Sequence, residues 1–215
     1  MASRDDGGPG CRHAVMNGSI AEQKAALRRE LRTVLRGFPP EQRAEASRRL
    51  CAVARESAPW QAARAILFYS PLAEEPDLGP LLGEALAAGR VAGLPRFDPL
   101  TGAYLPRQVR RWPEDLEPGR FGVLEPVGDC PALDVKHLDL VLVPGIGFTL
   151  DGARLGRGKG YYDRLLSQVC GFKCGVAFEC QLVTVLPVEP HDIRLNGILT
   201  PSAWRCVSSQ DRVMK

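Results

Sequence analysis

The sequence lacks the cysteine patterns of disulfide-bonded and zinc-binding proteins. Its seven cysteines form no CxxC pair and are odd in number, which argues against a disulfide framework and against a paired-cysteine zinc site. Cys170, Cys174 and Cys180 lie close together, and their only histidine neighbour is the more distant His191. We therefore expect small buried thiols and no metal ligands here, in a protein of the reducing cytoplasm.

The chain also lacks long apolar runs and a strong charge of either sign. No apolar run approaches the roughly 18 residues of a membrane span, and the first residues lack the apolar core of a secretory signal. A formal net charge of +3 over 215 residues is too small to indicate a nucleic acid or a membrane as a partner. The composition therefore favours a small-molecule ligand in a locally positive pocket.

Histidine is scarce, with residues at positions 13, 137 and 191. No convincing Ser-His-Asp or Cys-His combination can be assembled from them, because His13 lies in an N-terminal segment that we expect to be disordered. His191 is open to two interpretations, a catalytic acid or base and a structural loop residue. The sequence thus gives no indication of a protein nucleophile.

The chain divides into one domain and two short ends. Its 215 residues, 45% of them hydrophobic, can bury the core of a single domain, which we place at residues 19–205. Residues 1–18 contain glycine and aspartate in a composition that buries little, so we expect a disordered extension, with Met16 as an alternative start. Residues 206–215 are expected to form a C-terminal tail.

Hydrophobic periodicity predicts alternating helices and strands. Ser19 and Glu22 form a capping-box pattern ahead of apolar residues at helical spacing, which predicts a helix from residue 19 to about Gly37. Further helices are expected at 40–56, 78–88 and 158–168, and strands at 65–69, 90–94, 105–109 and 140–143. Irregular segments around one hairpin are expected between residues 98 and 136. This alternation predicts an α/β fold whose ligands gather at the carboxyl ends of the strands.

Residues 154–163 are the most informative stretch. They read Arg-Leu-Gly-Arg-Gly-Lys-Gly-Tyr-Tyr-Asp, with three glycines, three cations, two tyrosines and one carboxylate. Glycines let the backbone approach an oxyanion while Arg and Lys neutralise its charge, so the stretch predicts a phosphate-binding loop, with Asp163 as a candidate magnesium ligand. The spacing matches neither a Walker A loop nor a dinucleotide fold. A tight structural turn is the alternative.

Further candidate binding residues lie outside this loop. Lys24 and Arg28 are one turn apart on the first expected helix, where they face a single anion or form a solvated basic face. Glu74 and Glu75 follow an apolar strand and are either surface carboxylates or acceptors for the N–H donors of a ligand. Arg96 follows a strand-ending proline and is a candidate for binding a phosphate or a carboxylate.

These features together resemble the signature of the 5-formyltetrahydrofolate cyclo-ligase family, whose members are also called methenyltetrahydrofolate synthetases. The resemblance includes the loop at 154–163, Pro-Gly-Ile-Gly-Phe at 144–148, Asp-Gly at 151–152, Lys-Ala-Ala-Leu-Arg at 24–28, Glu-Glu-Pro-Asp at 74–77, Leu-Pro-Arg-Phe at 94–97, Phe-Gly-Val-Leu-Glu-Pro at 121–126 and His-Asp at 191–192. It implies a monomer and a single three-layer domain with a mostly parallel central sheet covered by helices, of the NagB/RpiA/CoA transferase-like class.

The resemblance also implies roles for matching residues. Catalysis would rest on Lys24, Arg157 and Lys159, a metal on Asp163 and Asp192, and substrate binding on Glu75, Arg96 and Tyr161. The ATP-binding residues would be Lys24, Arg28, Arg154, Leu155, Gly156, Arg157, Gly158, Lys159, Gly160, Tyr161 and Tyr162. Core packing is an equal explanation for one of the two tyrosines. Asn196 is a departure, because the family often has Asp there, and an amide keeps the oxygen ligand but loses the charge.

The implied activity is the ATP- and Mg²⁺-dependent cyclisation of 5-formyltetrahydrofolate, polyglutamated or not, to 5,10-methenyltetrahydrofolate with release of ADP and phosphate. It would proceed by phosphorylation of the formyl oxygen and attack by N10. A non-catalytic folate- or nucleotide-binding homologue is the alternative. A sugar-phosphate isomerase is disfavoured by the early Lys24 and Arg28 and the late Asp192.

Overall fold

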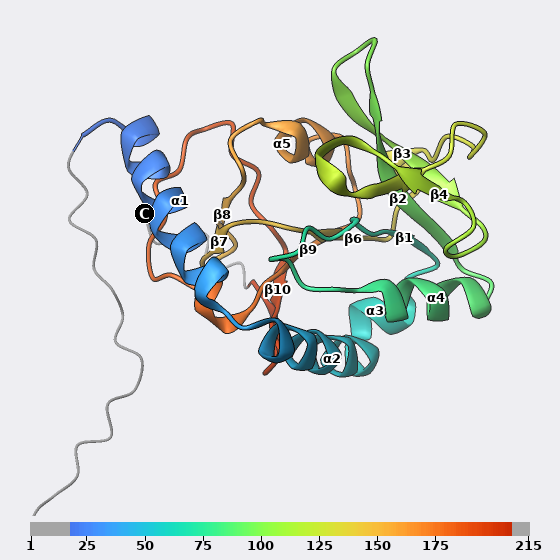
Figure 1. The fold of residues 1–215 in the computed structure, drawn as a ribbon, viewed down its shortest axis with the longest axis horizontal. Coiled ribbons are helices and arrows are strands. Elements are labelled where there is room, and N and C mark those ends of the chain that lie inside the picture. The colour runs from blue at the N-terminus through green and yellow to red at the C-terminus, as the bar shows by residue number, and fades with distance from the viewer. Residues whose placement is uncertain (1–17, 208–215) are drawn as a thin grey trace, which may run out of the picture.

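The structure, a computed structural model, describes residues 18–207 (Figure 1). The expectations for residues 1–17 and 208–215, including Met16 as a start, therefore lie outside the described residues. Within the described part, the chain folds around one large sheet and two small ones. None of its helices is long and apolar enough to cross a membrane.

Seven strands form the large sheet, in the order β11-β10-β9-β6-β1-β2-β3. The strands from β10 to β2 run parallel to one another, whereas β11 and β3 pair antiparallel at the two edges. The strands are β1 (Ala65–Leu67), β2 (Val91–Asp98), β3 (Ala103–Val109), β6 (Leu140–Val143), β9 (Phe172–Val176), β10 (Gly197–Leu199) and β11 (Trp204–Cys206). The predicted mostly parallel sheet is confirmed.

Helices cover both faces of this sheet. They are α1 (Ile20–Gly37), α2 (Pro40–Glu56), α3 (Ala58–Ala62), α4 (Gly79–Ala87) and α5 (Tyr161–Leu166). Figure 1 shows α2, α3 and α4 along one side of the strands and α5 on the other. Leu140 and Leu142 of β6 pack in a core with α2 and α4, whereas Val141 and Val143 pack in a second core with α5. Because successive strand residues point to opposite faces, the three-layer prediction is confirmed.

Short elements fill the connections between these layers. The small sheets pair β4 (Leu116–Pro118) with β5 (Leu124–Pro126), and β7 (Gly147–Phe148) with β8 (Arg154–Leu155). Short 3-10 helices span Arg120–Gly122, Val135–His137 and Glu179–Gln181. The segment between residues 98 and 136 thus holds a second hairpin, β4 with β5, besides the predicted one.

The first two helices begin where the sequence predicts. The Ser19 Oγ accepts a hydrogen bond from the Glu22 N–H, and the Glu22 carboxylate accepts one from the Ser19 N–H, which completes the capping box. Helix α2 has the predicted bounds because Pro40 occupies its first position, where a missing N–H costs no intrahelical hydrogen bond. These helix ends are decided locally, so the sequence alone predicts them.

Strand β2 corrects one predicted boundary. It continues through Pro95 to Asp98 rather than ending at Leu94, so Arg96 lies within the strand and not after it. Pro95 stands opposite Pro106 of β3. A non-hydrogen-bonded pair of an antiparallel ladder requires no N–H from either residue, so the two prolines are tolerated together.

Two other elements are shorter than predicted. Strand β1 ends at Leu67 rather than residue 69. The helix expected at 158–168 begins only at Tyr161, because Gly158 and Gly160 have φ angles of 98° and 65°, outside the right-handed helical region. The glycine-rich loop is therefore longer than the sequence pattern indicated.

The cysteines of the described chain are free thiols. Cys174 is buried and Cys180 is half-buried, whereas Cys170 is exposed, so the expectation of a buried thiol is wrong at that position. Burial raises the pKa of Cys174, which keeps this thiol protonated and unreactive.

The core packing of α2 leads to a stability prediction. Leu50 is 0% exposed and Leu100, in the turn between β2 and β3, is 94% exposed. We expect Leu50→Ala to lower the free energy of unfolding by about 2–5 kcal/mol, because it leaves a cavity under α2. Leu100→Ala, the same change at an exposed site, should stay within about 0.5 kcal/mol of the unchanged protein in urea unfolding. Equal effects of the two changes would contradict the core assignment.

Candidate active site

A cavity of about 590 Å³ lies at the carboxyl ends of β1 and β6. Segments that are far apart in the sequence line it: α1, the loops after β1 and β6, residues 154–163, and the turn at residues 189–192. Each of these segments except the loop after β6 contributes predicted ligand residues to the cavity. The expectation that a ligand site forms at the strand ends is thus matched by the shape of the molecule.

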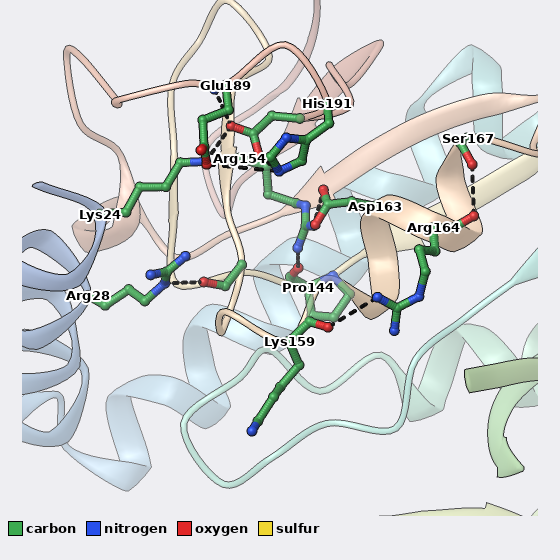
Figure 2. Close-up of polar contacts among 12 residues, drawn as sticks. Lys24, Arg28, Pro144, Arg154, Lys159, Asp163, Arg164, Ser167, Glu189 and His191 are labelled. Atoms are coloured by element: carbon green, nitrogen blue, oxygen red, sulfur yellow. Dashed lines mark hydrogen bonds and ion pairs between the residues drawn. The ribbon is translucent and has the colours of Figure 1, made fainter. Parts of the chain in front are cut away.

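The glycine-rich loop begins inside the small β7–β8 sheet. Arg154 and Leu155 are buried there, and Gly156 to Gly160 then run along the cavity to the first turn of α5. Lys159 sits between the two glycines of positive φ, and its side chain extends away from the other labelled residues in Figure 2. Within residues 18–207 its ammonium group makes no ion pair, so it is available to an anion.

Lys24 is buried and paired with two carboxylates. Its Nζ lies 2.7 Å from Glu189 Oε2 and 2.6 Å from Asp192 Oδ2, with 8% of the side chain exposed (Figure 2). Burial lowers the pKa of Lys24, but the hydrogen bonds and charges of Asp192 and Glu189 outweigh it and raise the pKa overall. Burial raises the pKa of Asp192, but the hydrogen bonds from Lys24 and from the Glu189 N–H, together with the charge of Lys24, outweigh it. The pKa of Asp192 is therefore lowered. The solvated-face interpretation of Lys24 is wrong.

Arg28 joins the first helix to the glycine-rich loop. Its Nε donates to the Gly156 carbonyl oxygen at 2.8 Å (Figure 2). Burial and then the positive charge of Arg32 lower the pKa of Arg28. Its Nη1 lies close to Gly158, which also lines the cavity, so an anion there would offset the repulsion from Arg32.

Arg154 is held on three sides. Its Nη2 lies 2.9 Å from Asp163 Oδ1, its Nη1 donates to the Pro144 carbonyl at 3.3 Å, and its guanidinium lies 5.6 Å from the ring centre of Tyr162. Its Nε is buried without a hydrogen-bond partner in the described chain. Tyr162 packs into the core and burial raises its pKa, so of the two tyrosines it is the one explained by packing.

Arg157 and Glu75 connect the glycine-rich loop to the loop after β1. The Nε and Nη2 of Arg157 donate to Glu75 Oε1 at 3.1 and 2.9 Å. Only 6% of the Glu75 side chain is exposed, compared with 34% for Arg157 and for Glu74. Glu75 is therefore a buried carboxylate and not a surface one, whereas Glu74 is partly exposed to solvent.

Tyr161 belongs to an aromatic cluster that the sequence did not indicate. Its ring centre lies 5.1 Å from that of Tyr104, on the β2–β3 hairpin, and 6.3 Å from that of Phe97. Burial and the neighbouring Glu125 raise the pKa of Tyr104 to about 12, so its phenol stays protonated. Tyr104 and Tyr161 both line the cavity and can form a wall for a flat ring.

The structure leaves Arg96, predicted to bind a ligand, outside the cavity. Arg96 pairs with Glu117, its Nη1 2.6 Å from Oε1, and also donates to the Pro126 carbonyl. Pro95 lines the cavity and Arg96 does not, among the described lining residues. Neighbouring strand residues point to opposite faces, so the geometry does not support a substrate contact for Arg96.

Glu189, by contrast, joins the site without having been predicted. A carboxylate oxygen of Glu189, one of Asp192 and a ring nitrogen of His191 lie within 4.8 Å of one another, as a metal-binding group would require. The sequence feature that could have predicted this role is the position of Glu189, a second carboxylate two residues before the His-Asp pair. Asp163 is not part of this group and pairs with Arg154.

Asn196 has a different place from the one its motif suggested. Its side-chain oxygen accepts from the Lys173 N–H at 2.9 Å, at the start of the β9–β10 pairing, and it does not line the cavity. The Asn196 side chain therefore supports the pairing of β9 with β10 and lies outside the described cavity.

Known proteins resemble the chain over this whole domain. The model of the 5-formyltetrahydrofolate cyclo-ligase family matches residues 20–201. The 5-formyltetrahydrofolate cyclo-ligase of Mycolicibacterium smegmatis is 35% identical over 144 residues, which cover 64% of this chain and 74% of that protein. That of Mus musculus is 29% identical over 197 residues, which cover 84% of this chain and 95% of that protein.

A solved structure agrees in both fold and sequence. The NMR structure of the Aquifex aeolicus 5,10-methenyltetrahydrofolate synthetase superimposes with a TM-score of 0.78 and 31% identity, and covers 86% of this chain and 93% of its own. A 5,10-methenyltetrahydrofolate synthetase from Mycoplasma pneumoniae shares the fold with a TM-score of 0.66 at 22% identity. The chain therefore belongs to the 5-formyltetrahydrofolate cyclo-ligase family of enzymes.

Proposed function

We propose that the protein converts 5-formyltetrahydrofolate to 5,10-methenyltetrahydrofolate in a reaction that consumes ATP, requires Mg²⁺, and releases ADP and phosphate. The observation that carries the proposal is the meeting of the glycine-rich loop, Lys24, Glu75 and the Glu189–Asp192 turn in one cavity. Such a cavity joins a polyphosphate-binding segment to a buried carboxylate suited to a second ligand.

In this reaction the protein has to align the two substrates and to neutralise the charge of the phosphates. A formyl oxygen is a poor leaving group; ATP would supply the phosphoryl group that makes it a good one, and N10 of the same folate would then close the ring. The nucleophile is a substrate nitrogen, so no protein nucleophile is needed. Holding the reacting groups together would account for most of the acceleration.

The cations of the site fit a polyphosphate. Lys159 extends without an ion-pair partner among residues 18–207, and Arg28 is fixed to the loop by its bond to Gly156. Lys24, Arg154 and Arg157 are each already paired with carboxylates. A phosphate group that reaches these three must therefore compete with the protein's own anions.

The carboxylates fit a divalent cation. Glu189 and Asp192 offer the hard oxygen ligands that Mg²⁺ prefers, and Asp163 lines the same cavity. When bound, Mg²⁺ would supply positive charge next to the phosphates. Held by Asp192 and Glu189, it would leave the Lys24 ammonium free for a phosphate oxygen, and held by Asp163 it would do the same for Arg154. The donor set thus suits nucleotide and metal together.

The folate would occupy the part of the cavity near Glu75. Its buried carboxylate can accept the N–H donors of a pterin ring. Tyr104 and Tyr161 provide aromatic surface in the same cavity, against which a flat ring can stack.

The direct test is formation of the methenyl product. Purified protein mixed with 5-formyltetrahydrofolate, ATP and Mg²⁺ should develop the methenyl-folate absorbance band, and omission of any one component should abolish it. Binding of folate by the folded protein without any band would support the non-catalytic homologue instead.

Lys159 is expected to be essential for turnover. We expect Lys159→Ala to lower kcat by about 10²–10³-fold, because it removes a positive charge that faces the transferred phosphoryl group. The folded state should persist, since no packed group is lost. Lys136→Ala, the same change at an exposed position outside the cavity, serves as the control in steady-state kinetics. Normal turnover by Lys159→Ala would show that the loop does not bind the phosphates.

Asp192 is expected to set the magnesium requirement. Asp192→Asn keeps the shape of the side chain but loses its charge, so we expect the Mg²⁺ concentration for half-maximal activity to rise by about 10-fold or more. Asp129→Asn, at an exposed position outside the cavity, should leave it unchanged. A lower kcat with an unchanged magnesium requirement would mean that Asp192 acts only through Lys24.

A further inference from the structure

The Arg157–Glu75 ion pair joins residues that the proposed function assigns to different ligands. Arg157 lies in the glycine-rich loop and Glu75 in the loop after β1, 82 residues earlier. Both nitrogens that Arg157 directs at Glu75 converge on one oxygen, Oε1. In this position the Arg157 guanidinium covers Oε1 and blocks the approach of another hydrogen-bond donor from that side.

The two partners differ in how firmly they are held. The other oxygen of Glu75, Oε2, accepts from the Leu72 N–H at 3.0 Å, and the side chain is almost fully buried. Arg157 is one-third exposed and stands between Gly156 and Gly158, in a loop with left-handed backbone at Gly158 and Gly160. The carboxylate is thus the fixed member of the pair, and the guanidinium is the member that can change partner.

A polyphosphate offers Arg157 a stronger partner than Glu75. It carries several negative charges and accepts the two-pronged hydrogen bonds that a guanidinium prefers. Once Arg157 turns to it, the Glu75 carboxylate loses its cation. An unpaired buried carboxylate is unfavourable, so it binds N–H donors of a second ligand more strongly than before.

We propose that Arg157 is a positioning residue that covers Glu75 until a polyphosphate draws it away, so that nucleotide binding and folate binding strengthen each other. The inference rests on the proposed function, since it takes ATP and a folate as the two ligands. Linkage requires the effect to be reciprocal: folate must tighten nucleotide binding by the same factor. A cover that is closed nine-tenths of the time weakens folate binding about 10-fold, and removing it restores that affinity.

The experiment is calorimetric titration of the full chain with 5-formyltetrahydrofolate, with and without saturating Mg²⁺ and the non-hydrolysable adenosine 5′-(β,γ-imido)triphosphate. For the unchanged protein we expect the nucleotide to lower the folate Kd by about 10-fold. For Arg157→Gln without nucleotide we expect the folate Kd to fall by a similar factor, and the nucleotide should then change it less than about 2-fold. A loss of charge that tightens binding is not expected of a residue with a merely structural role.

Lys159→Gln is the matched control, because it removes a cation from the same loop but makes no contact with Glu75. Its folate Kd without nucleotide should equal that of the unchanged protein, while its nucleotide Kd rises. Weaker folate binding by Arg157→Gln, or nucleotide coupling that survives the change, would overturn the inference and leave the proposed function standing if the unchanged chain turns over. A chain that neither turns over nor binds the two ligands would overturn the proposed function, and this inference with it.

Discussion

Charge balance inside the cavity is the constraint on which this site depends. Lys24 is held by Glu189 and Asp192, and Arg154 by Asp163. Each of these charges is at least partly withdrawn from water. An ion buried in this way without a partner would cost several kcal/mol. The ion pairs therefore offset the cost of burying these charges when the protein folds. If the proposed function holds, a nucleotide would have to exchange partners with these pairs, and the Mg²⁺ it brings would take over the released carboxylates.

The central sheet and an apolar cluster outside it together place these charges. The parallel strands β1 and β6 are neighbours and deliver two loops to one edge of the sheet. In helix α1, Leu35 joins the core with α2 and α4. Leu27 and Leu31 lie instead in a separate apolar cluster with Leu155 and Ile146, beside the small β7–β8 sheet. This apolar contact brings Lys24 and Arg28 to the glycine-rich loop. Apolar packing outside the cavity thus sets the positions of Lys24 and Arg28.

The accuracy of the sequence-based predictions follows the range of the interactions involved. The ends of α1 and α2 depend on a capping box and a proline at the first turn, and the predicted bounds agree with the structure. Strand β2 continues past a proline because it pairs with β3, a later segment, at a position where neither residue needs to donate an N–H. Sequence reading near Pro95 has no access to that partner, so it ended the strand too early.

The sequence by itself determined the family of the chain and the class of its fold, because these depend on residue types at short spacing. Only the tertiary structure decided which side chains share the cavity. Arg96 turns away because strand residues alternate between faces, whereas Glu189 turns in to pair with Lys24, 165 residues earlier. Contacts between distant segments come from how whole elements pack, and no local pattern encodes them.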